Sequence, residues 1–310
     1  LPGSESTGRG RGEVSVDSVA QQILNGLTLG STYALLALGL AIVFSIIGLV
    51  NFAHGELITI CAYTMLAMRY LGLPWVAWAI SGVVAAVAAA LVMERLAFRP
   101  VRHASPVTMM LTSFGVSVLI AAAFEIFVSP RPRAVPQPDW ITTAFNVLGL
   151  QVRVEHIFTF GVTAVALVGL LVLLRRTVIG AAMRAAAEDF DAVRLMGIRA
   201  NAVIASAFAL SGLLAGLAGL LILSRRGVVN PHMGLFLGLN AFVANVIGGM
   251  GNLWGAVAGG FILGFAEVAL RAWLPSSLSG LTQGFLFLMV AVFLLIWPHG
   301  LFGQKTAVRV

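Results

Sequence analysis

The sequence predicts an all-α fold: a polytopic transmembrane helical bundle of eight or nine membrane segments, with one or two short or broken helices. The first observation is composition. Of the 310 residues, 59% are hydrophobic and only 10% are charged, with a mean hydropathy of +0.99. Soluble domains carry about 25% charged residues, so a soluble enzyme or regulator is excluded. The second observation is that the charged residues gather in short clusters between long apolar runs.

Membrane spans are expected wherever about 20 mostly apolar residues follow one another. No charged residue occurs between Asp17 and Glu56, so the first span falls in that interval. The full-length spans are predicted at Ala20–Leu49, Trp75–Met93, Val107–Val128, Ile157–Leu174, Ala200–Ser224, Leu253–Leu270 and Leu281–Trp297. Two further apolar runs, Leu57–Met68 and Leu235–Ile247, are shorter and either cross the membrane or re-enter it.

Composition divides the chain into a membrane domain and two tails. Residues 1–18 are rich in Gly, Ser and Arg and are expected to form a flexible tail. Residues 19–303 form the transmembrane domain, and residues 304–310 form a short tail. The longest polar stretch inside the membrane domain covers residues 175–199.

The basic residues predict membrane orientation rather than nucleic-acid binding. The net charge is +7, but 18 of the 19 basic residues are Arg in short loop clusters, which fits the loop cations that orient membrane proteins. One side carries Arg95, Arg99, Arg102, Arg175, Arg176, Arg184, Arg194, Arg199, Lys305 and Arg309. The other side carries Arg69, Arg131, Arg133, Arg153, Arg225, Arg226 and Arg271. The first, larger group is assigned to the cytoplasm, so the C-terminus is inside; the side of the N-terminus depends on whether Leu57–Met68 crosses.

The motifs of enzymes are missing from the sequence. The five histidines are scattered without metalloprotease spacing, and no G-x-S-x-G sequence is present. The single cysteine, Cys61, makes neither an internal disulfide nor a cysteine-based metal site. Gly300–Thr306 lacks the Gly-Lys pair of a phosphate loop. We therefore expect no catalytic residue, cofactor or metal, and no ATP hydrolysis by this chain itself.

A few polar residues fall within or beside the predicted spans. Glu56 and Glu125 lie near span ends, which favours interfacial positions, and Glu267 is spaced to pair with Arg271 at i,i+4. Polar groups are costly in contact with lipid. The residues that line an aqueous pathway, or alternatively bond between helices, are predicted to be Asn51, His54, Glu56, Asn230, His232, Asn240 and Asn245.

Two patterns suggest how the spans pack. Glycines recur every four residues at Gly251, Gly255 and Gly259, at Gly260 and Gly264, and at Gly212 and Gly216, a spacing that lets helices approach closely in lipid. The sequences Val50–Gly55 and Val229–Gly234 echo each other, and each precedes a short apolar run. Such echoes are typical of inverted repeats in transporters, although chance similarity explains so short a match equally well.

The polar stretch at residues 177–199 predicts two short helices. Ala181–Ala187 is a strong helix former, a second helical element begins with Glu188 and Asp189, and Gly197 is a suitable stop. A short amphipathic helix is marginal in water on its own. We therefore expect it to dock on a soluble partner or, alternatively, on the membrane face of its own chain.

Several motifs occur in a distinctive order between Val19 and Gly303. They are Asn25-Gly26-Leu27 with Gly30-Ser31-Thr32-Tyr33-Ala34-Leu35, then Val50–Glu56, then Gly180 with Arg184–Asp189 and Ala192–Ile198, then Gly248–Asn252 with Gly255-Ala256, and finally Pro298–Gly303. Together they resemble the branched-chain amino acid permeases, the membrane subunits of ABC-type importers. The chain departs from that family at its Arg-rich tail and at Trp297-Pro298, where the family more often has Arg before Pro.

The resemblance implies a role for the polar stretch and a set of partners. The stretch is similar to the loop that couples the permease to its ATPases, and the residues implied are Gly180, Arg184, Ala187, Glu188, Asp189, Ala192, Arg194, Leu195, Gly197 and Ile198. The implied partners are a second permease subunit that is non-identical, two cytoplasmic ATP-binding subunits and an extracytoplasmic solute-binding protein. The implied location is the bacterial cytoplasmic (inner) membrane.

Three functions stay open on these grounds. The first is an ATP-driven importer of branched-chain or other amino acids. The second is an ABC permease for urea or short amides, because the solute is selected mainly by the binding protein. The third is an autonomous secondary transporter or channel. Neither the solute nor the choice between homodimer and heterodimer follows from the sequence.

Overall fold

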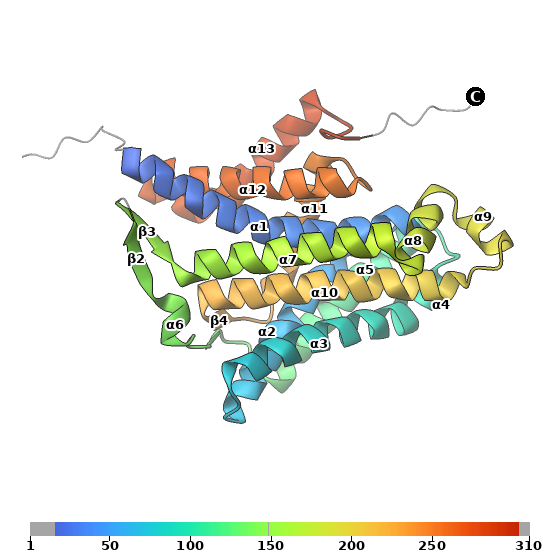
Figure 1. Ribbon diagram of the computed structural model, residues 1–310, viewed down its shortest axis with the longest axis horizontal. Helices are drawn as coiled ribbons and strands as arrows, with labels where there is room; N and C mark the ends of the chain where they lie inside the picture. Colours follow the sequence, from blue (N-terminus) through green and yellow to red (C-terminus); the bar gives the residue numbers. More distant parts are fainter. Residues whose placement is uncertain (1–15, 148, 304–310) are drawn as a thin grey trace, which may run out of the picture.

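The computed structural model describes residues 16–147 and 149–303, and this part of the chain is mostly helical. Seven spans within it are long and apolar enough to cross a membrane. They are α1 (Val16–Ile47), α3 (Trp75–Met93), α5 (Pro106–Phe127), α7 (Val154–Arg176), α10 (Ala200–Arg226), α12 (Leu253–Trp273) and the span that ends with α13 (Thr282–Ile296). Most of them run along the long axis of the molecule (Figure 1). The predicted helical membrane bundle is confirmed.

The two shorter apolar runs form shorter helices. The first lies in α2 (Glu56–Tyr70), which follows the 3-10 turn η1 (Phe52–Gly55), and the second lies in α11 (Met233–Gly248). Both helices begin among buried residues rather than at the surface. The expected total of eight or nine membrane segments stays a prediction, because it depends on whether α2 and α11 cross.

Four short strands depart from the expected all-α fold. β2 (Ala144–Val147) and β3 (Leu150–Arg153) form an antiparallel hairpin, and β1 (Arg133–Ala134) pairs with β4 (Val228–Val229). The β1–β4 pair joins segments that are almost a hundred residues apart, which sequence periodicity does not report. The remaining elements are η2 (Glu94–Phe98), a π-helical turn that continues α3, then α4 (Arg99–Val101), α6 (Asp139–Thr142), α8 (Val178–Glu188), α9 (Phe190–Leu195) and η3 (Ser276–Leu281).

The two ends of the bundle carry different elements. The β2–β3 hairpin and α6 lie at one end, here called the hairpin end, and α8 and α9 lie at the other, the α8–α9 end (Figure 1). α1 begins at the hairpin end, and the described chain finishes at the α8–α9 end (Figure 1). The predicted tails at residues 1–18 and 304–310 lie outside the described residues, except that residues 16–18 begin α1.

The predicted division of the basic residues matches these ends. Within the described residues, the larger group lies on elements that approach the α8–α9 end: Arg95, Arg99, Arg102, Arg175, Arg176, Arg184, Arg194 and Arg199. The smaller group lies on elements that approach the hairpin end: Arg69, Arg131, Arg133, Arg153, Arg225, Arg226 and Arg271. Lys305 and Arg309 fall outside the described residues.

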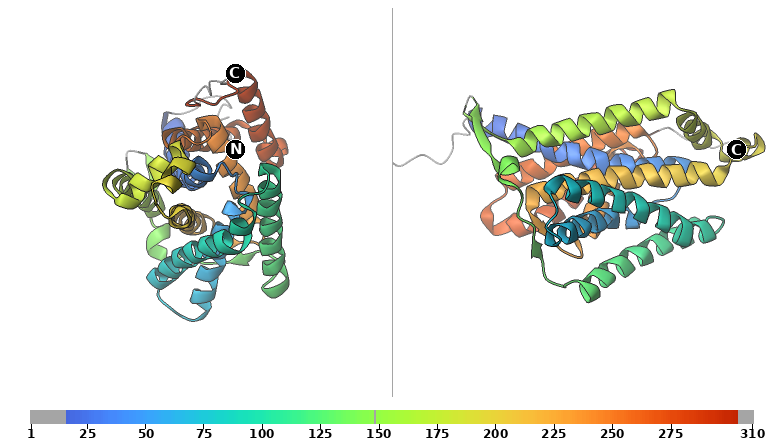
Figure 2. Two further views of the ribbon diagram at one scale, coloured as in Figure 1. Left: turned by 90° about the vertical axis from the view of Figure 1, so that its right-hand side faces the viewer. Right: turned by 60° about the horizontal axis from the view of Figure 1, so that its bottom comes forward.

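α1 and α10 form the centre of the bundle. Of their most apolar stretches, 83% and 72% respectively are buried, whereas α5 and α7 reach only 22% and the α13 span 11%. The right-hand view of Figure 2 shows α3 and α5 on the outside of this central pair. The peripheral helices therefore expose broad apolar faces, as expected where lipid or another membrane subunit covers them.

The two halves of the bundle pack in the same way but run in opposite directions. α1 packs against α12 and α10 packs against α3, while α2 contacts α10 and α11 contacts α1. α1 ends at the α8–α9 end, whereas α10 ends at the hairpin end (Figure 1). This is the arrangement of an inverted repeat, in which α1, α2, α3 and α5 correspond to α10, α11, α12 and α13.

The turn before each short helix supports this correspondence. Asn51 Oδ1 accepts a hydrogen bond from Ala53 N–H at 3.0 Å, and Asn230 Oδ1 accepts one from His232 N–H at 3.1 Å. In both turns the asparagine carbonyl oxygen also accepts a bond from the N–H three residues on, at 3.2 and 3.3 Å. The echo between Val50–Gly55 and Val229–Gly234 is therefore matched by an identical hydrogen-bonded turn.

The glycine rows lie at helix contacts, as their spacing predicted. A Cβ on Gly264 would overlap the backbone of Gly30 on α1, and a Cβ on Gly212 would lie 2.9 Å from Ala86 O on α3. Contacts this close bring backbones together and raise dispersion attraction where no hydrophobic force drives helices together. Gly260 and Gly264 thus hold α12 on α1, Gly255 and Gly259 hold it on α11, and Gly212 and Gly216 hold α10 on α3.

Candidate functional site

The polar stretch at residues 177–199 forms α8 and α9. Thr177 Oγ1 accepts a hydrogen bond from Gly180 N–H at 3.0 Å and caps α8. Gly180, Met183 and Ala186 form its buried face, and α8 contacts α7, α1 and α10. A Cβ on Gly180 would overlap the backbone of Leu173 and Leu174. α8 is therefore anchored on the spans of its own chain.

The opposite surfaces of α8 and α9 expose apolar side chains. Val178 is 87% exposed and Leu195 is 90% exposed, and their neighbours Ile179 and Met196 are also exposed. We call these four residues the exposed apolar pairs. Large apolar side chains that stay exposed beside charged residues are available for contact with another surface.

α9 is held more loosely than α8. Asp189 Oδ1 accepts a hydrogen bond from Ala192 N–H at 2.9 Å and caps the helix, which ends before Gly197. Gly197 has a φ of +77°, so the predicted stop is confirmed. A cavity of about 230 Å³ lies beside α9; its lining includes Ile46, Ile47, Arg102, His103, Phe190, Arg194, Ala200 and Ile204. The helix therefore has room to shift against α1, α10 and the loop after α4.

The predicted coupling residues divide by exposure. Seven are exposed at the α8–α9 end: Arg184, Ala187, Glu188, Asp189, Arg194, Leu195 and Gly197. Ala192 and Ile198 are half-buried, and Gly180 is buried against α7. The group thus forms a surface on two short helices with one internal anchor.

His54 bonds to both central helices. Its Nε2 lies 3.1 Å from Leu36 O on α1, and its Nδ1 lies 2.9 Å from Ser211 Oγ on α10. The ring is fully buried. Both nitrogens are satisfied, so His54 acts in this state as a bridge between α1 and α10.

The position of Glu56 differs from the expectation that this residue lies at the membrane interface. The residue is fully buried, because α2 begins inside the bundle, and its Oε1 accepts a hydrogen bond from Ser117 Oγ on α5 at 2.9 Å. Among the described residues, neither its Oε2 nor Thr59 Oγ1 has a hydrogen-bond partner. A Cβ on Gly234 would lie 2.5 Å from Thr59 Oγ1 and 2.6 Å from Glu56 Oε2, so α11 closes over these two polar groups.

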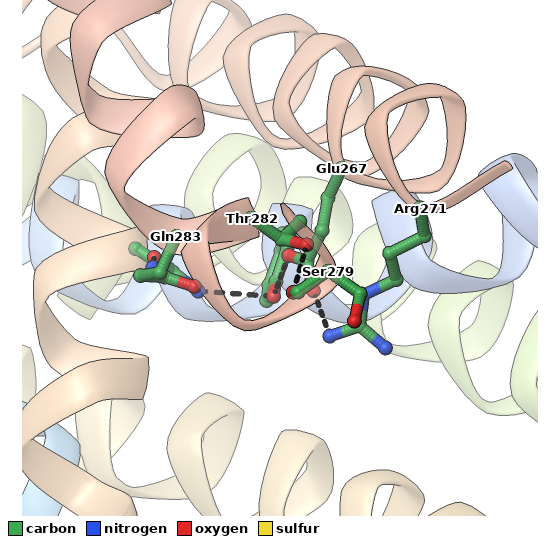
Figure 3. A network of polar contacts seen from close by, with 7 residues as sticks. Glu267, Arg271, Ser279, Thr282 and Gln283 are labelled. Carbon is green, nitrogen blue, oxygen red and sulfur yellow. Dashed lines mark hydrogen bonds and ion pairs between the residues drawn. The ribbon is translucent and has the colours of Figure 1, made fainter. Parts of the chain in front are cut away.

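A second polar network joins four helices (Figure 3). Arg271 donates to Glu267 Oε1 at 2.5 Å, which confirms the predicted i,i+4 pair. Tyr33 OH donates to Glu267 Oε2 at 2.5 Å and accepts from Asn240 Nδ2 at 3.0 Å, and Gln283 Nε2 donates to Asn240 Oδ1 at 2.6 Å. Sequence analysis missed Tyr33 and Gln283, because a hydroxyl or amide within an apolar run gives no periodic signal.

The remaining predicted residues have hydrogen-bond partners outside both clusters. Asn245 donates from Nδ2 to Ala37 O at 3.1 Å and thereby joins α11 to α1. His232 is exposed, and its Nε2 lies 2.7 Å from Glu125 Oε1. Asn230 closes the turn before α11. The seven predicted pathway residues therefore belong to several separate sets of contacts rather than one site.

Comparison with known proteins gives a consistent result over nearly the whole chain. Residues 22–296 match the family model described as "Branched-chain amino acid transport system / permease component". LivH of Salmonella typhimurium, a high-affinity branched-chain amino acid transport system permease protein, is 34% identical over 94% of this chain and 97% of its own length. BraD of Pseudomonas aeruginosa, described in the same words, is 36% identical over 80% of this chain and 84% of its own. LivM of Escherichia coli K12 is 30% identical over 88% of this chain and 68% of its own.

Proposed function

Because this chain belongs to the branched-chain amino acid transport system permease family, we propose that it is one membrane subunit of an ATP-driven importer of branched-chain amino acids. The observation that carries the proposal is the pair of short helices α8 and α9. Their inner faces contact the chain's own spans, and their outer faces expose apolar side chains. A subunit built in this way needs a soluble partner at that end.

The α8–α9 end faces the cytoplasm. Within the described residues, eight basic residues lie toward that end and seven toward the hairpin end, which is the direction that the positive-inside rule expects of cytoplasmic loops. Two ATP-binding subunits dock on the exposed apolar pairs of this chain and of its membrane partner. ATP binding moves α8, and Gly180 passes the movement to α7 because the two backbones touch. This is a population shift, and it requires different contacts in the two states.

The second permease subunit covers the face formed by α5 and α13. These two helices correspond in the inverted repeat and lie on the same side of the molecule in the left-hand view of Figure 2. Both expose large apolar side chains, such as Leu119 and Leu295. Between them lie η1 and the start of α11, where the helices are broken, and transporters place their pathways at such breaks.

The pathway follows these broken helices. Phe52 on η1 and Phe242 on α11 lie 5.7 Å apart between ring centroids, and Phe236 on α11 is exposed. An apolar side chain of a substrate matches these rings, while Glu125 and His232 at the hairpin end match its charged groups. A solute-binding protein delivers the substrate at that end, where Trp140, Phe145 and Val147 are exposed.

Transport by the assembled complex tests the proposal. The chain, a LivM-like permease, the two ATP-binding subunits and the binding protein are reconstituted in liposomes, and uptake of labelled leucine is measured. We expect uptake that requires ATP and the binding protein. Uptake by this chain alone, driven by an ion gradient, would overturn the ATP-driven assignment. Uptake of urea or acetamide instead of leucine, set by the binding protein, would overturn the assigned solute.

A further inference from the structure

An apolar groove runs between α7 and α10. It encloses about 660 Å³, within the range of about 300–1,000 Å³ typical of small-molecule sites. Its walls include Phe158, Val162 and Leu173 on α7 and Leu210, Leu214 and Leu217 on α10. From Phe158 to Leu173 the rise of an α-helix gives a length of about 22 Å. The groove is thus longer than half of the roughly 30 Å hydrocarbon core of a bilayer.

The groove is open toward the outside of the bundle. Val165, on its α7 wall, is 74% exposed. Gly161 and Gly169 also line it, and a Cβ added to either would meet no atom within 4 Å. Because α7 is one of the membrane spans, this opening lies at the depth of the lipid chains rather than in water.

The α10 wall leads to a cluster of charge at the hairpin end. Leu210, Leu214, Leu217, Leu221 and Arg225 follow one another at helical spacing along one stripe. Leu221 and Arg225 line a second, polar cavity of about 140 Å³, which Arg226 and Arg271 also line.

The charges around this second cavity do not balance. The three guanidinium groups of Arg225, Arg226 and Arg271 face two carboxylates, Glu267 and Glu155. Glu155 lies 3.9 Å from Arg225 Nε, at the limit of an ion pair, and Glu267 is already bonded to Arg271. This second cavity, which lies beyond the groove along α10, is therefore net positive and has guanidinium donors for an anion.

We propose that the α7–α10 groove is a phospholipid site that binds one acyl chain between the two helices and an anionic headgroup at Arg225 and Arg226. The apolar walls match an acyl chain, and the guanidinium groups beyond them match a phosphate headgroup. The bound lipid fills the space between α7 and α10, and α7 is the helix that leads directly into α8.

A helix of another membrane subunit fits the groove less well. The closest helix contacts in membranes are enriched in small residues four apart. Here Val165 stands between Gly161 and Gly169 and projects outward. A helix would also leave the net positive cavity without an anion, whereas a phosphate headgroup supplies one.

The test compares retained lipid in matched variants of the full importer complex. The complex is purified from membranes and its bound lipids are counted by native mass spectrometry. It is then titrated with vesicles of phosphatidylglycerol or phosphatidylethanolamine. Gly169→Leu and Gly161→Leu add a side chain at the groove wall, where a Cβ meets nothing within 4 Å, and Gly280→Leu on η3, where a Cβ also meets nothing within 4 Å, is the control. Arg225→Gln is paired with Arg131→Gln, which lies at the same end outside both cavities.

We expect the complex to retain phosphatidylglycerol, the two groove variants to lose it, and the Gly280→Leu control to keep it. Arg225→Gln weakens phosphatidylglycerol binding about fivefold, as expected for one basic residue near an anionic headgroup, and Arg131→Gln leaves it unchanged. Retention in both groove variants overturns the site, and equal affinity for the two headgroups overturns the role of the arginines. Cross-linking of a Val165→Cys variant to the second permease subunit shows that a protein covers the groove and also overturns the proposal.

Discussion

The centre of the bundle and its α8–α9 end are packed in opposite ways. At the centre, α2 and α11 cross so closely that a Cβ on Gly55 would overlap Gly234 O. At the α8–α9 end, Leu195 is almost fully exposed and a cavity of about 230 Å³ lies beside α9. At the crossing there is no room for a Cβ at Gly55, whereas the α8–α9 end has an exposed apolar surface and a cavity beside α9.

The difference separates packing that the chain completes by itself from a surface that, under the proposed function, a partner completes. Tight packing at the α2–α11 crossing fixes the relation between the two inverted halves without any other subunit. The exposed apolar pairs gain burial only when another protein covers them. Substitutions at the crossing should therefore reduce stability, and substitutions on α8 and α9 should reduce coupling. The predictions below test this division.

The largest loss of stability is expected from Gly55→Ala. The new methyl group meets backbone atoms of Gly234 and Gly238, which cannot rotate away. Overpacking typically costs about 1–3 kcal/mol of folding free energy, and the loss here should lie at the upper end, because the methyl group meets backbone. Thermal unfolding followed by size-exclusion chromatography measures the loss, with Gly115→Ala as the control at a site without neighbours. Equal melting temperatures for the two variants would show that the crossing adapts, and the comparison would fail.

A smaller loss is expected from Glu267→Gln. The change removes the charge that accepts bonds from Arg271 and Tyr33, and hydrogen bonds to charged groups contribute about 1.5–3 kcal/mol. The loss should fall toward the lower figure, because Arg271 is more than half exposed and its charge is screened by solvent. The double variant Glu267→Gln with Arg271→Gln should lose less than the sum of the single variants. Full additivity would show that the pair does not interact.

Sequence reasoning succeeded where the signal was local. The full-length spans follow from hydropathy, and the Glu267–Arg271 pair follows from helical spacing. The start of α9 after Asp189 and its end before Gly197 follow from residues that favour the beginning and the stop of a helix. Each of these depends on residues within one or two helical turns of one another.

Sequence reasoning failed where contacts join distant segments. Glu56 stands at the end of an apolar run, which suggested an interfacial position, yet α2 begins inside the bundle and Ser117 on α5 binds the carboxylate. Tyr33 looked like an ordinary residue of a span, although its hydroxyl joins Glu267 to Asn240. Hydropathy gives the length of an apolar run but not the depth in the bundle at which its helix begins. It therefore does not detect a helix that starts among buried residues.

At the α8–α9 end, Asp189→Ala should cost about 1 kcal/mol of stability, since it removes the cap of α9. Asparagine caps helices as well as aspartate does, so Asp189→Asn should keep both the helix and ATP-dependent uptake. Uptake in proteoliposomes separates the two variants. If Asp189→Asn loses as much uptake as Asp189→Ala, the carboxylate charge contacts the partner directly and its role is more than capping.

The smallest effect on stability, with a large effect on function, is expected from Leu195→Glu. The leucine contributes little to the packing of its own chain, because 90% of it is exposed, and surface substitutions change folding free energy by about 0.5 kcal/mol or less. At the proposed interface, the substitution replaces an apolar side chain that an ATP-binding subunit would bury with a charged one that has no partner. Burial of an unpaired charge is strongly unfavourable. The melting temperature should stay the same while ATP-dependent uptake and co-purification of the ATP-binding subunits are lost.

Leu71→Glu supplies the matched control for this last prediction, because Leu71 is also exposed but follows α2 near the hairpin end. The same change there should leave the association with the ATP-binding subunits intact. If both variants lose the subunits equally, an added charge disturbs the complex at either end and α9 has no special role. If neither loses them, the exposed apolar pairs are not the docking surface, and the incomplete packing beside α9 needs another explanation. If only Leu195→Glu loses the subunits, the ATP-binding subunits bind the α8–α9 end of the bundle and cover its exposed apolar pairs.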